Sequence, residues 1–276
     1  MMTKLAKQII STLPQNKISK AVGILAKSSL SKHFIQPFAN HFKIDTSLTE
    51  KPVSQYKSLN EFFTRRLKEG ARPINNEVGS IVSPVDGVIA QMGEIKNGTL
   101  IQAKGIHYSL QQLIANGNHS VFEDGQFMTV YLSPSDYHRI HMPFTATITE
   151  YKYVPGRLFP VNDIGVNYVE GLFTKNERLT TFFNINGNHA ALVKVGAFIV
   201  GSIQITYEDS IHNQHRGQSM QSILKEEPTY QKGEELGWFE FGSTIILILD
   251  KNAGEFLTSL QPGDKLLMGQ KIGLLS

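Results

Sequence analysis

Apolar residues recur at helical spacing along the first forty residues. Three sets repeat every three or four positions, namely Leu5, Ile9 and Leu13, then Ile18, Val22 and Leu25, then Leu30, Phe34, Phe38 and Phe42. Pro14 and Pro37 interrupt the pattern. This spacing predicts amphipathic helices. The longest apolar run, residues 21–26, is much shorter than the ~18 residues of a membrane-spanning helix, and we expect no signal-peptide cleavage site.

Residues 58–70 have the signals of one further short helix. Ser58 and Glu61 have the spacing of a capping box, and Gly70 has the residue type that ends a helix. Leu59, Phe62, Phe63 and Leu67 would form its apolar face.

The pattern beyond residue 80 is mostly that of strands. Short apolar or alternating segments, separated by Gly, Asn, Asp and Pro, predict strands at residues 87–92, 99–103, 128–132, 145–154, 180–185, 191–195, 198–206 and 237–249. Residues 108–115 are typical of a helix, and 208–232 of a surface loop.

Strands without regularly intervening helices favour antiparallel sheets packed face to face. We therefore predict an α+β fold that is mainly β. In this prediction residues 1–57 form a basic helical region and residues 58–276 a β-rich catalytic domain.

Charge is unevenly distributed along the 276 residues. Residues 1–44 contain seven lysines and no acid (Lys4, Lys7, Lys17, Lys20, Lys27, Lys32 and Lys43). Lysines on amphipathic helices indicate docking to an anionic membrane surface. The alternative is that the helices pack on the protein body with their lysines in solvent.

Common catalytic motifs are absent from the sequence. It has no cysteine, which excludes thiolate nucleophiles, disulfides and Cys-ligated metals. It also has no glycine-rich phosphate loop, no H-E-x-x-H and no G-x-S-x-G. The pairs His138/His141 and His212/His215 lack carboxylates at metal-ligand spacing, so we expect no metal site.

Three local segments carry candidate chemistry. Residues 83–87 (SPVDG) place Asp86 in a turn, residues 136–143 (DYHRIHMP) hold two histidines, and residues 239–247 (FEFGSTIIL) place Gly-Ser-Thr inside an apolar strand. Taken singly, each has a structural explanation as a turn, a packed histidine or a bulge. Together they supply carboxylate, imidazole and hydroxyl, the parts of an activated nucleophile.

In this order the three segments resemble the phosphatidylserine decarboxylases, enzymes that depend on a pyruvoyl group. Supporting resemblances extend over nearly the whole chain, at residues 60–63, 72–74, 158–162, 176–178 and 195–203. Phe241 departs from the family pattern, which has leucine before Gly242.

The resemblance implies that the chain cuts itself between Gly242 and Ser243. Ser243 would be the nucleophile, His141 its general base and Asp86 the group that orients His141. The products would be a β chain of residues 1–242 and an α chain of residues 243–276, whose first residue becomes the pyruvoyl group. The two chains would stay together as a heterodimer, and a higher oligomer is left open.

The resemblance also implies the reaction. The pyruvoyl carbonyl would form a Schiff base with phosphatidylserine, release CO₂ and yield phosphatidylethanolamine. His138 would contact the substrate or reprotonate it, and Tyr137 would help to hold the headgroup. Spacing alone leaves the roles of His138 and His141 exchangeable. The expected location is peripheral, on the cytoplasmic face of an anionic membrane, with no nucleic-acid partner.

Three other functions remain open at this stage. A pyruvoyl-dependent decarboxylase of a soluble amino acid would use the same self-cleavage but would not explain the basic helices. A non-enzymatic β-sandwich that binds membranes would keep the helices and stay uncut. A serine hydrolase is disfavoured because Ser243 lacks a nucleophile elbow.

Overall fold

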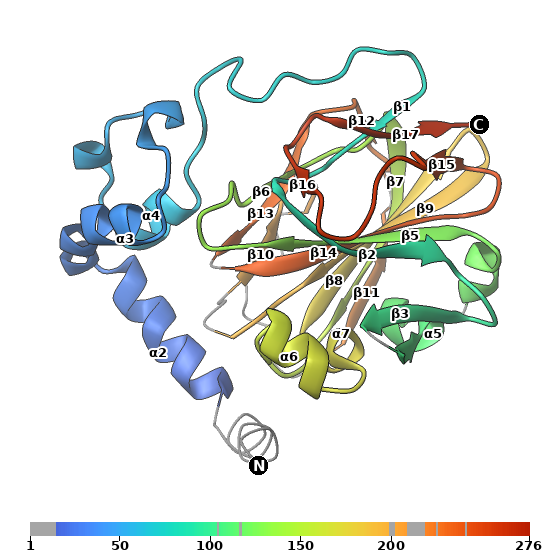
Figure 1. Ribbon diagram of the computed structural model, residues 1–276, viewed down its shortest axis with the longest axis horizontal. Coiled ribbons are helices and arrows are strands. Elements are labelled where there is room, and N and C mark those ends of the chain that lie inside the picture. The colour runs from blue at the N-terminus through green and yellow to red at the C-terminus, as the bar shows by residue number, and fades with distance from the viewer. Residues whose placement is uncertain are drawn as a thin grey trace.

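A nine-stranded antiparallel sheet forms the centre of the molecule (Figure 1). The computed structural model describes residues 15–103, 105–115, 118–198, 202–208, 219–224, 226–240 and 242–276. In spatial order the strands are β11 (Met220–Ile223), β7 (Ala146–Val154), β8 (Arg178–Ile185), β9 (Asn188–Val195), β14 (Ser243–Leu249), β5 (Gln126–Leu132), β2 (Gly87–Glu94) and β16 (Lys265–Leu266), with β12 (Thr229–Tyr230) also paired to β7. The predicted mainly-β fold with antiparallel sheets is confirmed.

Two three-stranded sheets cover one face of this central sheet. One contains β10 (Ser202–Ile205), β13 (Glu235–Glu240) and β6 (Arg139–His141), and the other contains β1 (Ser80–Val82), β17 (Lys271–Leu275) and β15 (Gly254–Phe256). The main hydrophobic core lies between the layers, because buried side chains from all three sheets belong to one cluster. Ile245 and Leu247 of β14 face this core, and Ile246 faces the opposite core, as strand alternation requires.

Helices and a hairpin cover the opposite face of the central sheet. The hairpin joins β3 (Thr99–Ala103) to β4 (Ile106–Ser109), and the helices are α5 (Leu110–Ile114), α6 (Asp163–Tyr168), α7 (Leu172–Lys175) and the 3₁₀ turn η4 (His119–Phe122). Their apolar side chains share a second core with Phe63 and Ala26 of the N-terminal region. That region is therefore packed onto the β-rich body.

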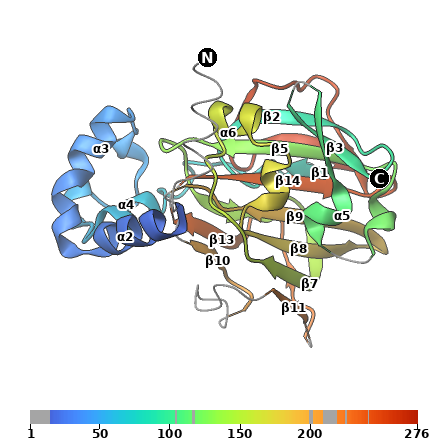
Figure 2. The same ribbon diagram turned by 90° about the horizontal axis from the view of Figure 1, so that it is seen from below.

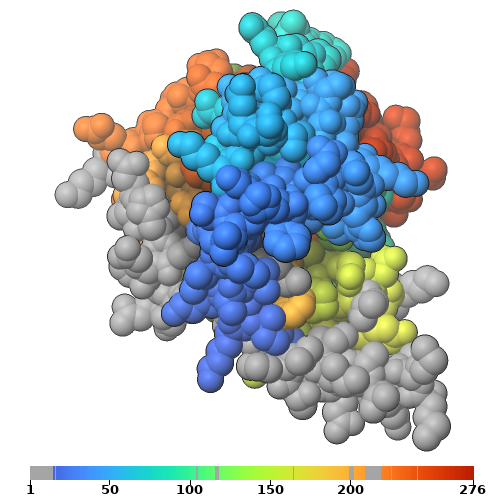
Figure 3. Space-filling view, turned by 90° about the vertical axis from the view of Figure 1, so that its left-hand side faces the viewer, coloured from blue at the N-terminus to red at the C-terminus, as the bar shows by residue number. Residues whose placement is uncertain are grey.

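The N-terminal region projects from one end of the body (Figure 2) and covers much of the face seen in Figure 3. It contains α2 (Gln15–Lys27), η1 (Ser29–Phe34), α3 (Ile35–His41), η2 (Thr46–Leu48), η3 (Val53–Gln55) and α4 (Leu59–Phe63), around a small core of its own. The helices predicted around residues 18–25 and 30–42 are confirmed, whereas the one predicted at 5–13 lies outside the described residues. Among the described residues, no helix has the length and apolar character needed to cross a bilayer.

Two predicted elements have different boundaries in the structure. The Ser58 hydroxyl accepts from the Glu61 N–H as predicted, but α4 ends at Phe63 and not near Gly70, since Arg65 turns inward to the carbonyl groups of Ser135 and Asp136. Within the predicted loop 208–232 lie the short strands β11 and β12.

The single strand predicted at residues 237–249 is two strands in two different sheets. β13 belongs to a three-stranded sheet and β14 to the central sheet. The apolar run hides this break, because both halves are buried. The chain therefore turns from one sheet to the other between Glu240 and Ser243.

Lys194 of β9 is a fully buried amine in the main core. It lies directly opposite Ile245 and so shares a face of the sheet with it. Its Nζ donates to the Thr181 hydroxyl, which also bonds the Tyr207 hydroxyl at 2.5 Å. No carboxylate among the described residues pairs with it, and burial lowers the pKa of Lys194 to about 7.

We expect Lys194→Met to raise the free energy of unfolding at pH 7, on the order of a few kcal/mol. The native pKa lies below the ordinary value of about 10.4, so the unfolded chain binds more protons between pH 7 and 10. The free energy of unfolding of the unmodified protein therefore falls as the pH falls through that window. The variant lacks the titrating amine, so its free energy of unfolding should depend less on pH there. Urea unfolding at several pH values measures it, with the exposed Lys251→Met as control. Parallel pH profiles for all three proteins would show the expectation to be wrong.

Candidate active site

Gly242 forms the corner between β13 and β14. Its φ of +25° lies in the left-handed region that glycine adopts readily. A Cβ built on Gly242 would meet no atom within 4 Å, so the backbone angle and not crowding favours glycine here. Ser243 follows as the first residue of β14 and is paired with Leu132 of β5. The Gly242–Ser243 bond thus lies where a turn becomes a fixed strand.

The Ser243 side chain is buried on the core side of the central sheet. It shares that face with Ile245 and is 0% exposed. Its hydroxyl has no hydrogen-bond partner among the described residues. A buried hydroxyl without a partner costs free energy and calls for a functional explanation.

His138 is a neutral imidazole with one unused nitrogen. Its Nδ1–H donates to the Asp136 carbonyl at 2.8 Å, which leaves Nε2 as the unprotonated nitrogen. Within the described part of the chain Nε2 has no partner. The ring packs on Phe63 at 4.1 Å between centroids, and burial lowers the pKa of His138 to about 3.

His141 has both ring nitrogens in hydrogen bonds. Its Nδ1–H donates to the Gly233 carbonyl at 2.8 Å, and its Nε2 accepts from the Tyr137 hydroxyl at 3.2 Å. Burial raises the pKa of Tyr137 to about 12, so its O–H remains a donor. Burial lowers the pKa of His141, opposed in part by the Gly233 carbonyl and by the charges of Glu235 and Asp86.

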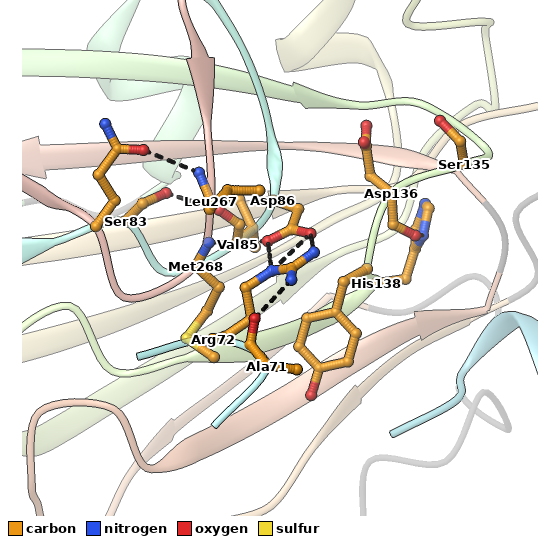
Figure 4. Close-up of polar contacts among 12 residues, drawn as sticks. Ala71, Arg72, Ser83, Val85, Asp86, Ser135, Asp136, His138, Leu267 and Met268 are labelled. Atoms are coloured by element: carbon orange, nitrogen blue, oxygen red, sulfur yellow. Dashed lines mark hydrogen bonds and ion pairs between the residues drawn. The ribbon is translucent and has the colours of Figure 1, made fainter. Parts of the chain in front are cut away.

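Asp86 is bound to Arg72 and not to a histidine (Figure 4). Its carboxylate accepts from Arg72 Nε at 2.8 Å, from Arg72 Nη2, and from the Met268 N–H at 2.8 Å. In this structure Asp86 and His141 have other hydrogen-bond partners, so the orientation of His141 by Asp86 is not seen here as a contact. A two-pronged guanidinium is the stronger partner for a carboxylate, and Asp86 acts on His141 only through its charge.

The three candidate segments nevertheless meet around β13. β6 pairs with β13, with His141 opposite Glu235, and the His138 carbonyl accepts from the Phe239 N–H at 3.0 Å. The His141 N–H donates to the Pro84 carbonyl, and this bond links β6 to the turn that holds Asp86. The predicted residues thus flank the strand that leads to Gly242, although within the described residues no hydrogen bond joins Ser243 to either imidazole.

Two structural anchors nearby were not assigned a role from the sequence. The Asn176 side chain bonds both backbone groups of Phe159 and the Gly196 carbonyl. Arg178 donates to the carbonyl groups of Gln112, Leu113, Thr174 and Asn176. Both belong to segment 176–178, one of the segments that carried the resemblance, and they fix the chain where β9 ends.

Comparison with known proteins decides the family. The family model for phosphatidylserine decarboxylase matches residues 59–274. The chain belongs to the phosphatidylserine decarboxylase family. Similar family members named phosphatidylserine decarboxylase proenzyme occur in Brevibacillus brevis, with 47% identity over 98% of this chain and 97% of the relative, and in Acinetobacter baylyi, with 41% identity over 95% and 93%. One in Coxiella burnetii is 39% identical over 100% of this chain and 98% of its own.

Proposed function

We propose that this phosphatidylserine decarboxylase is made as a proenzyme, cuts its own Gly242–Ser243 bond, and then converts phosphatidylserine to phosphatidylethanolamine and CO₂. The observation that carries this proposal is the corner at Gly242, where a buried serine hydroxyl without a described partner follows a left-handed glycine. The test is release of CO₂ from phosphatidylserine by the processed protein, dependent on Ser243.

The cut begins with attack of Ser243 Oγ on the Gly242 carbonyl carbon. The hydroxyl proton passes to a histidine and then to the Ser243 nitrogen as the peptide C–N bond breaks, which leaves an ester. Loss of the Ser243 α-proton breaks the Cβ–O bond, frees the Gly242 carboxylate and leaves dehydroalanine. Addition of water and loss of ammonia then give a pyruvoyl group at position 243.

We assign the base of this cut to His141. A useful base has a pKa near the working pH, and a pKa of about 3 makes His138 a weak proton acceptor. His141 is 9% exposed, and nearby carboxylates partly oppose the effect of burial on its pKa. The Tyr137 hydroxyl donates to His141 Nε2, and this hydrogen bond must break before Nε2 can accept the Ser243 proton.

The surroundings of Ser243 fit a pyruvoyl group. The position is buried and lies on the apolar core side of β14. A pyruvoyl group supplies an electrophilic carbonyl that takes the substrate amine and draws electrons as CO₂ leaves. His138 Nε2, which has no described partner, would take up the proton that the substrate amine releases as it adds to the carbonyl, and would return that proton to the substrate α-carbon after CO₂ leaves.

The α chain would remain attached after the cut. β14 is its first segment and lies between β5 and β9, with seven and six residue pairs. The last strand of the α chain, β17, also pairs with β1 of the β chain. The heterodimer therefore keeps an intact sheet.

The N-terminal region would hold the enzyme on an anionic membrane. Ile24, Leu25, Leu30 and Phe34 are 61–70% exposed, beside exposed lysines of α2 and η1. Apolar side chains among acyl chains and lysines on anionic headgroups are the pattern of interfacial helices. Lys27 pairs with Glu240 at 2.6 Å, so α2 contacts the strand that leads to Gly242.

We expect the triple variant Ile24→Gln, Leu30→Gln, Phe34→Gln to bind phosphatidylserine-containing vesicles at least tenfold more weakly, because each buried apolar side chain contributes about 1.5–3 kcal/mol. Vesicle flotation measures the loss. The matched control is Val78→Gln with Ile223→Gln, which removes apolar side chains that are 96% and 71% exposed elsewhere. An equal loss in both variants, or none in the triple variant, would refute docking through this face.

A further inference from the structure

A polar cavity lies between the N-terminal region and the β-rich body. Its volume is about 240 Å³, and its walls include Lys43, Arg65 and Arg72 on one side and Asp86, Tyr137 and Lys265 on the other. Asp86 and Tyr137 belong to both the cavity wall and the candidate active site. The cavity is thus a neighbour of the site.

Arg65 is the unusual member of this wall. It is 4% exposed, and its Nη2 donates to the carbonyl groups of Ser135 and Asp136. Its Nε and Nη1 are buried without a partner in the described part of the chain, although the guanidinium lies 5.2 Å from the Phe62 ring centre. A buried cation with unmet donors is costly, and an anion is the group that relieves that cost.

Two further cations of the wall, Lys43 and Lys265, also have no ion pair among the described residues. The acids of the wall are already engaged. Asp86 binds Arg72, Asp45 accepts from the Ser47 N–H and hydroxyl, and Asp136 accepts from the Ser133 N–H and hydroxyl. The wall therefore holds four cations and three carboxylates, a formal surplus of one positive charge.

Building on the proposed function, we propose that Arg65, Lys43 and Lys265 bind the phosphodiester of the substrate headgroup in this cavity. A phosphodiester is anionic at every working pH and offers several acceptor oxygens, which suits one guanidinium and two ammonium groups. The volume is below the roughly 300–1,000 Å³ of pockets for drug-sized ligands, so the cavity suits a headgroup while the acyl chains stay in the bilayer.

The test measures binding without chemistry. The Ser243→Ala full-length chain is titrated by calorimetry with glycerophosphoserine, the headgroup without acyl chains. We expect binding, and a loss of at least about tenfold when Lys43→Gln and Lys265→Gln are combined. The control pair Lys57→Gln and Lys68→Gln removes equal charge through exposed lysines of the same region that do not line the cavity and should leave the affinity within twofold. Arg65→Lys keeps the charge, loses the planar fork and should also weaken binding.

Competitors identify the part of the headgroup that is bound. Inorganic phosphate should displace glycerophosphoserine, and free serine should not. Displacement by serine alone, no binding to the parent chain, or equal affinity in the cavity and control pairs would overturn the proposal. This measurement needs no cleavage. A chain that binds the headgroup but never forms fragments would therefore contradict the proposed function and still support the phosphodiester site.

In the processed enzyme the same lysine pair should raise KM for phosphatidylserine and leave kcat unchanged. The cleaved fraction should also be unchanged, because neither lysine contacts the Gly242 corner. A fall in kcat alone would contradict a binding role.

Discussion

We expect the Ser243→Ala variant to remain a single chain of 276 residues, while the unmodified sequence yields fragments of 242 and 34 residues. The reason is that alanine removes the only oxygen placed to attack the Gly242 carbonyl from within the same residue pair. Loss of the nucleophile removes the covalent pathway altogether, so the expected effect is complete. Intact-mass analysis of freshly purified protein measures it. The small fragment of the unmodified protein should begin with a pyruvoyl group and not with serine.

Thr244→Ala is the matched control for this experiment. Thr244 is the next residue, is equally buried, and also has a hydroxyl without a partner among the described residues. Strand alternation turns it to the opposite face of the sheet from Ser243. The variant should therefore still cut itself. An uncut Thr244→Ala chain that is folded, or a cut Ser243→Ala chain, would show that Ser243 is not the nucleophile.

The second large effect separates the two histidines. We expect His141→Gln to block formation of the fragments, and His138→Gln to form them but to lose decarboxylation by about a hundredfold or more, the range for one general acid–base group. Intact mass gives the first result, and CO₂ release per cleaved chain gives the second. Glutamine retains hydrogen-bonding groups in both positions but cannot take up a proton.

The pH dependence of self-cleavage also tests the assignment of His141 as the base. A base acts in its neutral form, and burial lowers the pKa of His141 below its usual range. The rate should therefore hold as the pH falls through 6.5, the ordinary histidine value, and decline only at lower pH. If His138→Gln blocks the cut and His141→Gln does not, the two roles are exchanged.

Much of the fold was predictable because periodicity reports burial. The segments around β5, β7, β8 and β9 were found within a few residues, since each is long and apolar or alternating. Short strands such as β6, β15 and β16 were missed, because two or three residues carry no measurable period. The corner at Gly242 was also hidden, as an apolar run does not reveal that its two halves enter different sheets.

The sequence predicts which segments carry the candidate site, but not the contacts between them. Asp86, His138, His141 and Ser243 were named from short segments and a family resemblance, and the structure brings their segments together around β13. The partner of Asp86 was not predictable, because Arg72 lies 14 residues away and nothing in its local pattern marks an ion pair. Nothing in the sequence around Arg65 predicts that its guanidinium is buried, since burial of a charge depends on tertiary packing.

The most direct test of the account follows the carboxyl carbon of the substrate. Processed protein is given vesicles of phosphatidylserine labelled with ¹³C in the serine carboxyl group, and in parallel free serine with the same label. We expect labelled CO₂ from the lipid with an equal amount of phosphatidylethanolamine, little from free serine, and none from either with Ser243→Ala. Cleaved protein that releases no labelled CO₂ from the lipid, or that releases it equally well from free serine, would contradict the account.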